Sequence, residues 1–206
     1  MTDPAAQSPG GRPDIELDTA TLRVLAHPMR VSVLRLLRQR GPSTATRLAA
    51  ELGINPGAAS YHLRRLAAGG LIVEDEERGT GRDRWWTAVH RQSIYDPAAA
   101  PVEQREVGRT YTHAVALAAI QRLRRAAEEI PRLPEEWAEV STYADFTFRL
   151  TPDELDGLRA ELLEVLHRYQ QRQAAESGSS AGAIPVSLQV QAFPVPGEPD
   201  PGPRPE

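Results

Sequence analysis

Helix-breaking signals occur at short intervals between residues 27 and 70. They are His27-Pro28, Gly41-Pro42, Gly53, Asn55-Pro56 and Gly69-Gly70. The residue before a proline avoids helical geometry, proline suits a first helical turn, and glycine commonly follows a helix end. The apolar residues between these signals recur at helical spacing. The sequence therefore predicts four short helices, over residues 19–26, 28–40, 44–52 and 55–68.

A β-type segment follows the last of these helices. Residues 71–73 form a short apolar run, residues 77–82 are rich in turn-forming types, and residues 84–89 are predicted to be a returning strand. Two helices joined by a tight turn and followed by a hairpin form a winged helix-turn-helix. We expect a mainly α fold with a small β component (α+β), with this domain over residues 18–95.

The stretch from Leu25 to Val89, about a third of the chain, resembles the winged-helix domain of the ArsR-like (arsenical-resistance-repressor-like) transcription regulators. The segments that carry the resemblance are, in order, Leu25-Ala26-His27-Pro28-Met29-Arg30-Val31, Leu34, Leu37, Thr46-Arg47-Leu48-Ala49, Ala59-Ser60-Tyr61-His62-Leu63-Arg64-Arg65-Leu66, Gly70-Leu71-Ile72 and Gly81-Arg82. The resemblance implies that the fourth helix contacts DNA. The family's metal motif needs cysteines in the third helix. This chain has no cysteine, so we expect no metal site there.

The distribution of charge supports an anionic partner for this domain. The chain has a net charge of -4, yet residues 20–95 hold 12 arginines against six acidic residues. Small and hydroxylated side chains on the fourth helix allow close approach to a groove, and arginine can bind guanine with two hydrogen bonds. We predict that DNA is contacted by Thr44, Thr46, Asn55, Gly57, Ala58, Ser60, Tyr61, His62, Arg64, Arg65, Arg78, Arg82 and Arg84. For His62, burial and a phosphate contact are both open.

The hairpin carries opposing signals. Residues 74–77 are all acidic, whereas Arg78, Arg82 and Arg84 are basic. We expect the arginines to face DNA and the acids to face away. Trp85 and Trp86 alternate, so one is expected in the core and the other against a neighbouring helix. The alternative for the whole surface is a winged helix that binds protein instead of DNA.

The second half of the chain has its own pattern, and we assign residues 101–193 to it. A long helix is predicted over residues 101–130, followed by a half-buried strand over 142–150, a helix beginning at the capping box Thr151-Pro152-Asp153-Glu154, a linker over 177–183 and a strand over 186–192. One stripe of the long helix is a candidate homodimer seam, formed by Ala116, Ile120, Leu123, Ala127 and Ile130. The stripe could instead pack on its own C-terminal module.

The C-terminal module also leaves room for an unidentified small-molecule effector. Its apolar residues Phe146, Phe148, Leu162 and Leu166 could enclose one, although a plain core is the simpler interpretation. Residues 1–17 and the proline-rich residues 194–206 are expected to be disordered tails, since neither can bury enough apolar surface.

Several classes of function find no support in the sequence. No apolar run approaches the roughly 20 residues of a membrane span, and we expect no secretion signal. No two of the five histidines are paired at metal-ligand spacing, and no phosphate-binding loop or nucleophile motif is present. We expect a cytoplasmic protein that is not an enzyme and uses no cofactor. It is predicted to be a homodimeric, sequence-specific regulator of transcription on double-stranded DNA. The alternative is a protein–protein adaptor.

Overall fold

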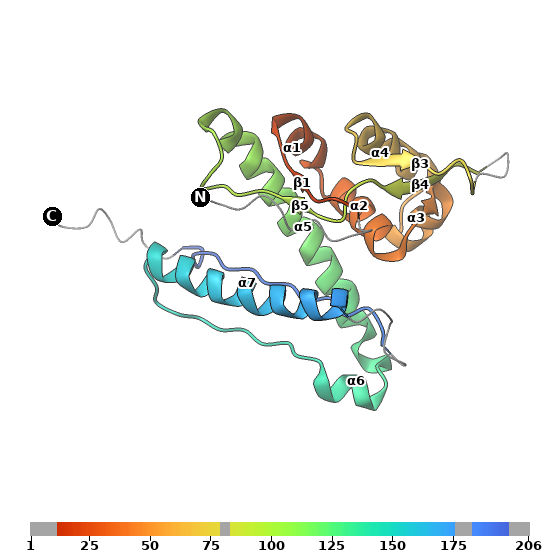
Figure 1. Cartoon of the computed structure of the whole chain (residues 1–206). Helices are drawn as coiled ribbons and strands as arrows, with labels where there is room; N and C mark the ends of the chain where they lie inside the picture. Colours follow the sequence, from red (N-terminus) through yellow and green to blue (C-terminus); the bar gives the residue numbers. More distant parts are fainter. Residues whose placement is uncertain (1–11, 79–82, 176–182, 198–206) are drawn as a thin grey trace. The chain divides into compact units, whose positions relative to one another are not determined.

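The computed structural model describes residues 12–78, 83–175 and 183–197. It divides into two units, residues 1–133 and 134–206, and each is considered by itself. The first unit opens with four helices, α1 (Thr19–Leu25), α2 (Pro28–Arg40), α3 (Ala45–Leu52) and α4 (Pro56–Ala68) (Figure 1). The four predicted helices are thus confirmed to within a residue or two at each end, and the fold is α+β.

Each of these helices begins at a side-chain cap. Asp18, Thr44 and Asn55 accept backbone hydrogen bonds at the starts of α1, α3 and α4, as short polar side chains commonly do. The cap of α2 is His27, whose Nδ1 accepts from the backbone nitrogen of Met29 at 3.1 Å. A side-chain hydrogen bond therefore caps each of the four predicted helix starts.

A three-stranded antiparallel sheet forms the wing. Its strands are β2 (Ser43–Thr44), β3 (Ile72–Glu74) and β4 (Trp85–Ala88), in the order β2-β4-β3. The predicted hairpin is confirmed, and the residue pair before α3 adds an edge strand that the sequence did not suggest. The turn at residues 79–82 lies outside the described residues.

The prediction of a disordered tail through residue 17 is wrong for residues 15–17. Residues Ile15–Glu16 form β1, which pairs in parallel with β5 (Ser93–Ile94). Leu17 then enters the core, so apolar burial and two backbone hydrogen bonds hold this segment. The predicted tail over residues 1–11 lies outside the described residues, as do residues 198–206.

One core joins α1 to α4 with the wing. Its members are buried apolar side chains of the four helices and the wing, together with Leu17, which was predicted to lie in a disordered tail: Leu17, Leu22, Leu25, Val33, Leu34, Leu36, Leu37, Leu48, Leu52, Leu63, Leu66, Leu71, Ile72, Trp86 and Ala88. Trp85 lies on the other face of β4, where the guanidinium of Arg47 on α3 stacks 4.7 Å from its ring centroid. Both halves of the tryptophan prediction are confirmed.

The long helix α5 (Arg105–Glu129) packs against α1 and α2. It is preceded by the short 3-10 turn η1 (Val102–Gln104) and followed by η2 (Ile130–Arg132). Small residues, Gly108, Ala114, Ala118 and Ala119, form its buried face and permit close approach. The predicted seam stripe lies on the opposite, exposed face.

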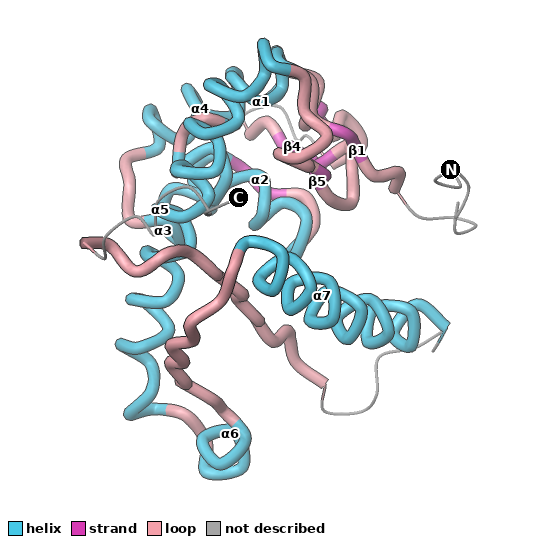
Figure 2. Tube along the Cα trace, turned by 90° about the vertical axis from the view of Figure 1, so that its left-hand side faces the viewer, coloured by secondary structure: helices cyan, strands magenta, loops and turns pink. Residues whose placement is uncertain are grey.

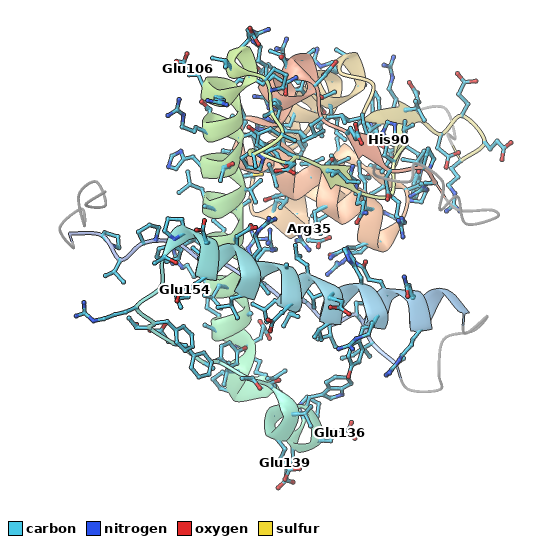
Figure 3. The ribbon with its side chains drawn as sticks, turned by 60° about the vertical axis from the view of Figure 1, so that its left-hand side comes forward. Arg35, His90, Glu106, Glu136, Glu139 and Glu154 are labelled. Carbon is cyan, nitrogen blue, oxygen red and sulfur yellow. The ribbon has the colours of Figure 1, made fainter. Side chains whose placement is uncertain are left out.

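The second unit contains two helices, α6 (Glu135–Val140) and α7 (Pro152–Ala175). The predicted capping box is confirmed: Thr151 Oγ1 accepts from the nitrogen of Glu154 at 3.3 Å, and a Glu154 oxygen accepts from the nitrogen of Thr151 at 2.7 Å. Figure 3 shows Glu154 at the start of α7.

The strands predicted over residues 142–150 and 186–192 are not present. Figure 2 draws both segments as loop, because neither has a strand partner among the described residues. The predicted linker falls largely on residues 176–182, which lie outside the described part. In the described ranges, no helix is long and apolar enough to cross a membrane.

Candidate nucleic-acid interface

The outer face of α4 is basic, polar and open. Tyr61, Arg64 and Arg65 are exposed on its middle turns, and Gly57 is exposed on its first turn. The opposite face, with Ala59, Leu63 and Leu66, is fully buried. Because the buried stripe fixes the rotation of α4, these polar side chains must project away from the core.

The N-terminus of α4 is shaped for close approach. Asn55 caps it by accepting from the nitrogen of Ala58 at 2.8 Å. A Cβ on Gly57 would lie 3.2 Å from the Asn55 side-chain oxygen, which is tighter than ordinary packing. Glycine therefore suits both the cap and a backbone exposed to a partner. Asn55 already has this structural role, while the half-buried Ala58 contributes mainly its backbone.

A groove separates α4 from the start of α3 and from the wing. Its volume is about 420 Å³, and its lining brings together Thr46, Gly57, Ser60, Arg64 and Arg84, which the sequence predicted as DNA contacts. The nitrogen Nε of Arg64 donates to the carbonyl oxygen of Ser60, one turn earlier, at 3.3 Å. The groove thus offers hydroxyl and guanidinium donors from three elements on one concave surface.

Two predicted contact residues are not available on the surface. Thr44 is 5% exposed, and its hydroxyl accepts from the nitrogen of Arg47 at 3.4 Å, so its side chain caps α3. His62 is 8% exposed and lies in the core side of α4. The burial of His62 and the capping hydrogen bond of Thr44 disfavour direct side-chain contacts with DNA, although Thr44 still lines the groove.

His62 instead pairs with the cap of α2. Its ring centroid lies 4.7 Å from that of His27. Burial lowers the pKa of His62, with smaller contributions from His27 and Arg30, and burial also lowers the pKa of His27. Both imidazoles therefore favour the neutral form, which His27 needs in order to accept its capping hydrogen bond.

An arginine that was not among the predicted DNA contacts lies on α2, close to the histidine pair. Arg30, on the first turn of α2, is partly buried, and the nearby charge of Arg65 adds to the burial that lowers its pKa. The repulsion between two guanidinium groups would be reduced by an anion near both of them. The only sequence signal for Arg30 was its place in the segment that carries the family resemblance.

The wing arginines pair with the acidic run instead of facing away from it. Arg78 lies 3.4 Å from Asp75, and Arg84 lies 3.7 Å from Glu74. This corrects the expected separation of acids from arginines. Both pairs are exposed, and such pairs are weak, about 1 kcal/mol or less, so a stronger anion can replace the carboxylate. Arg82 lies outside the described residues.

A further arginine links α5 to the helix-turn-helix. The guanidinium of Arg125 donates to the carbonyl oxygens of Glu51 at 3.0 Å and Leu52 at 2.7 Å. These are the last residues of α3, where unpaired carbonyls and the helix dipole favour a cation. No sequence pattern connects two residues more than 70 positions apart.

The first unit also matches a known kind of domain. Residues 25–75 match the family model of a helix-turn-helix domain. The match runs from the last residue of α1 to just past β3, so it includes α2, α3 and α4. A search of curated proteins finds no match to the chain. The chain therefore contains a helix-turn-helix domain, a module typical of DNA-binding regulators.

Proposed function

We propose that this chain is a sequence-specific, DNA-binding transcription regulator that acts as a homodimer on promoter DNA. The observation that carries the proposal is the outer face of α4, where Tyr61, Arg64 and Arg65 are exposed beside the groove. A major groove about 12 Å wide admits one α-helix, and arginine reads guanine there. The fold matches the helix-turn-helix arrangement, in which the second helix of the motif enters the major groove of DNA.

The resemblance to ArsR-like regulators supports the same proposal. The segments that carry it include the exposed Tyr61, Arg64 and Arg65 and the half-buried Arg30. Action at promoter DNA fits a cytoplasmic regulator that is not an enzyme. No described feature favours the protein–protein adaptor over this proposal.

A homodimer would double the contacts that one domain makes. The stripe Ala116, Ile120, Leu123, Ala127 and Ile130 has alternating spacings of four and three residues, the pattern of a coiled-coil seam. No described residue of the first unit covers it: Ile120 is 59% exposed and Leu123 is 50% exposed. Two domains related by a two-fold axis would address half-sites roughly 34 Å apart.

The DNA contact is tested by paired arginine variants in a binding titration on duplex DNA. Arg64→Ala with Arg65→Ala should weaken specific binding, by about 1–3 kcal/mol for each arginine that reads a base. The control removes the same charge from α1 and α5, by Arg23→Ala with Arg105→Ala. Wild-type affinity should fall about 10³–10⁵-fold between 50 and 200 mM salt if six to ten phosphates are contacted. An α4 variant that binds as well as the control contradicts the assignment, and no affinity for any duplex favours the adaptor.

The seam is tested separately by sedimentation. Ile120→Asp with Leu123→Asp should give monomers that keep helical circular dichroism, because the substituted side chains are exposed in a single chain. The control introduces two carboxylates off the stripe, by Gln121→Asp with Ala126→Asp, and should remain dimeric. A wild-type chain that is monomeric at micromolar concentration contradicts the homodimer. A stripe variant that unfolds shows that the stripe packs within its own chain.

A further inference from the structure

Residues 142–150 have the pattern of a strand but pair with no other strand among the described residues. Ala144, Phe146, Phe148 and Leu150 alternate with Tyr143, Asp145, Thr147 and Arg149. The rings of Phe146 and Phe148 stack with centroids 6.2 Å apart, so alternate residues already share one side, as in a β-strand. Yet Phe146 is 74% exposed and Phe148 is 63% exposed. The exposed apolar side of this segment is typical of a surface that packs against a partner, and none of the described residues covers it.

We propose that residues 142–150 pair with the same segment of a second copy, as an antiparallel ribbon centred on Thr147. This deepens the homodimer of the proposed function and rests on it, but it concerns a different contact from the α5 seam. The occupant is a second copy because the segment is complementary to itself when it is reversed.

The complementarity follows from the positions of the charges. A two-fold axis at Thr147 places Asp145 of one copy directly opposite Arg149 of the other, twice. On the other face it places Phe146 opposite Phe148, and Ala144 opposite Leu150. Opposite charges and aromatic pairs that face each other across strands are stabilising. In the part of the chain that the structure describes, no ion pair involves Asp145 or Arg149, so both are open to such a partner.

Neighbouring registers lose this match. A two-fold axis at Phe146 or Phe148 would place Asp145 opposite an uncharged residue. Centres at Asp145 or Arg149 put like charges opposite each other, which is destabilising. The charge pattern therefore selects a single register among the closely related ones. A two-stranded ribbon is marginal in water by itself, so this contact is expected to act together with the α5 seam.

Charge reversal provides a complementation test. In Asp145→Arg alone, arginine faces arginine across the ribbon, and in Arg149→Asp alone, aspartate faces aspartate. Each variant should weaken the dimer about tenfold or more in sedimentation, since two attractive pairs become repulsive. An equimolar mixture should restore wild-type affinity as heterodimers, because every opposing pair is again one arginine and one aspartate. Restoration also shows that both variants are folded.

Cross-linking tests the register independently. Because the chain has no cysteine, Thr147→Cys introduces a single thiol per copy. Residues directly opposite in an antiparallel pair have Cα atoms about 4.5–5.5 Å apart, within the range a disulfide spans. The full-length variant should therefore form a disulfide dimer on mild oxidation. Thr142→Cys should not, because the two copies of residue 142 would lie about 34 Å apart along the ribbon.

Three outcomes would overturn the inference. The first is a mixture of charge variants that stays as weak as each variant alone. The second is a Thr147→Cys chain that cross-links no faster than Thr142→Cys, as expected if residues 184–192 of the same chain cover the segment. Either result leaves the α5 homodimer standing. The third is a monomeric wild-type chain, which would refute both dimer contacts while leaving DNA binding by a single domain to be measured separately.

Discussion

Replacing Gly108 by alanine should destabilise the first unit, although alanine is the better helix former. Gly108 lies on the buried face of α5, and a Cβ there would overlap the hydroxyl and ring of Tyr95. That ring makes an edge-to-face contact with Tyr111, with centroids 5.8 Å apart and an interplanar angle of 90°. The substitution must therefore displace either Tyr95 or α5.

The magnitude follows from three opposing effects. Alanine gains about 1 kcal/mol over glycine in a helix interior. Overpacking a filled site costs about 1–3 kcal/mol, and loss of the aromatic pair costs about 0.5–1.5 kcal/mol more. The net expectation is a loss of about 0.5–3.5 kcal/mol in the free energy of unfolding. Gly157→Ala is the matched control: a Cβ there meets open space on α7, so it should stabilise its helix.

Urea unfolding gives the measurement. Because Trp137 lies in the second unit, tryptophan fluorescence is read in a Trp137→Phe background, where it reports Trp85 and Trp86 of the first unit, and circular dichroism reports the helices, α7 included. A double-mutant cycle isolates the contact: in a Tyr95→Ala background, Gly108→Ala should become neutral or stabilising, because the overlapping ring is gone. Gly108→Ala as stabilising as Gly157→Ala would refute the packing of α5 on this tyrosine. It would also show that α5 does not pack with Gly108 on its buried side, and the exposed stripe proposed as the dimer seam depends on that orientation.

Three further predictions concern pH, charge and the link to α5. Burial lowers the pKa of His27 and His62, so the unfolded chain binds protons more readily than the native chain. The free energy of unfolding should therefore fall as the pH drops below the ordinary histidine value of 6.5. A chain without both imidazoles should lose part of that dependence, because burial also lowers the pKa of His90. Equal free energies of unfolding from urea titrations at pH 5.5 and 7.5 would contradict this. Glu74→Gln with Asp75→Asn frees the two wing arginines and should raise DNA affinity at low salt with little effect on stability; unchanged affinity would show that the wing does not touch DNA. Arg125→Ala removes two hydrogen bonds to the end of α3 and should cost about 1–3 kcal/mol; a smaller loss than for the exposed Arg132→Ala would contradict the link.

The local architecture of the helix-turn-helix was predictable because its signals are local. Asn55-Pro56 begins α4 and Gly69 follows its last residue, as the sequence indicated. The capping box at Thr151 and Glu154 likewise depends on residues three apart. In each case one hydrogen bond within a few residues decides the boundary, so a single sequence contains the needed information.

The features that sequence reasoning missed depend on distant partners. For His62 the sequence left burial and a phosphate contact open, and what it could not indicate is the partner, His27, which lies against it from 35 positions earlier in the chain. The strand at Ile15–Glu16 is only two residues long and exists through its pairing with Ser93–Ile94. The alternation over residues 142–150 predicted a strand that the structure does not contain, because a strand also needs a partner, which alternation alone cannot indicate.

The central claim is that the exposed face of α4 reads a DNA sequence, and one measurement tests it most directly. Purified full-length protein is incubated with fragmented genomic DNA at moderate salt, and the retained fragments are sequenced. The account predicts enrichment of one inverted repeat with half-sites about 10–10.5 base pairs apart, lost with Arg64→Ala and Arg65→Ala but kept with Arg23→Ala and Arg105→Ala. No enriched sequence, or the same sequence enriched equally by the α4 variant, would contradict it.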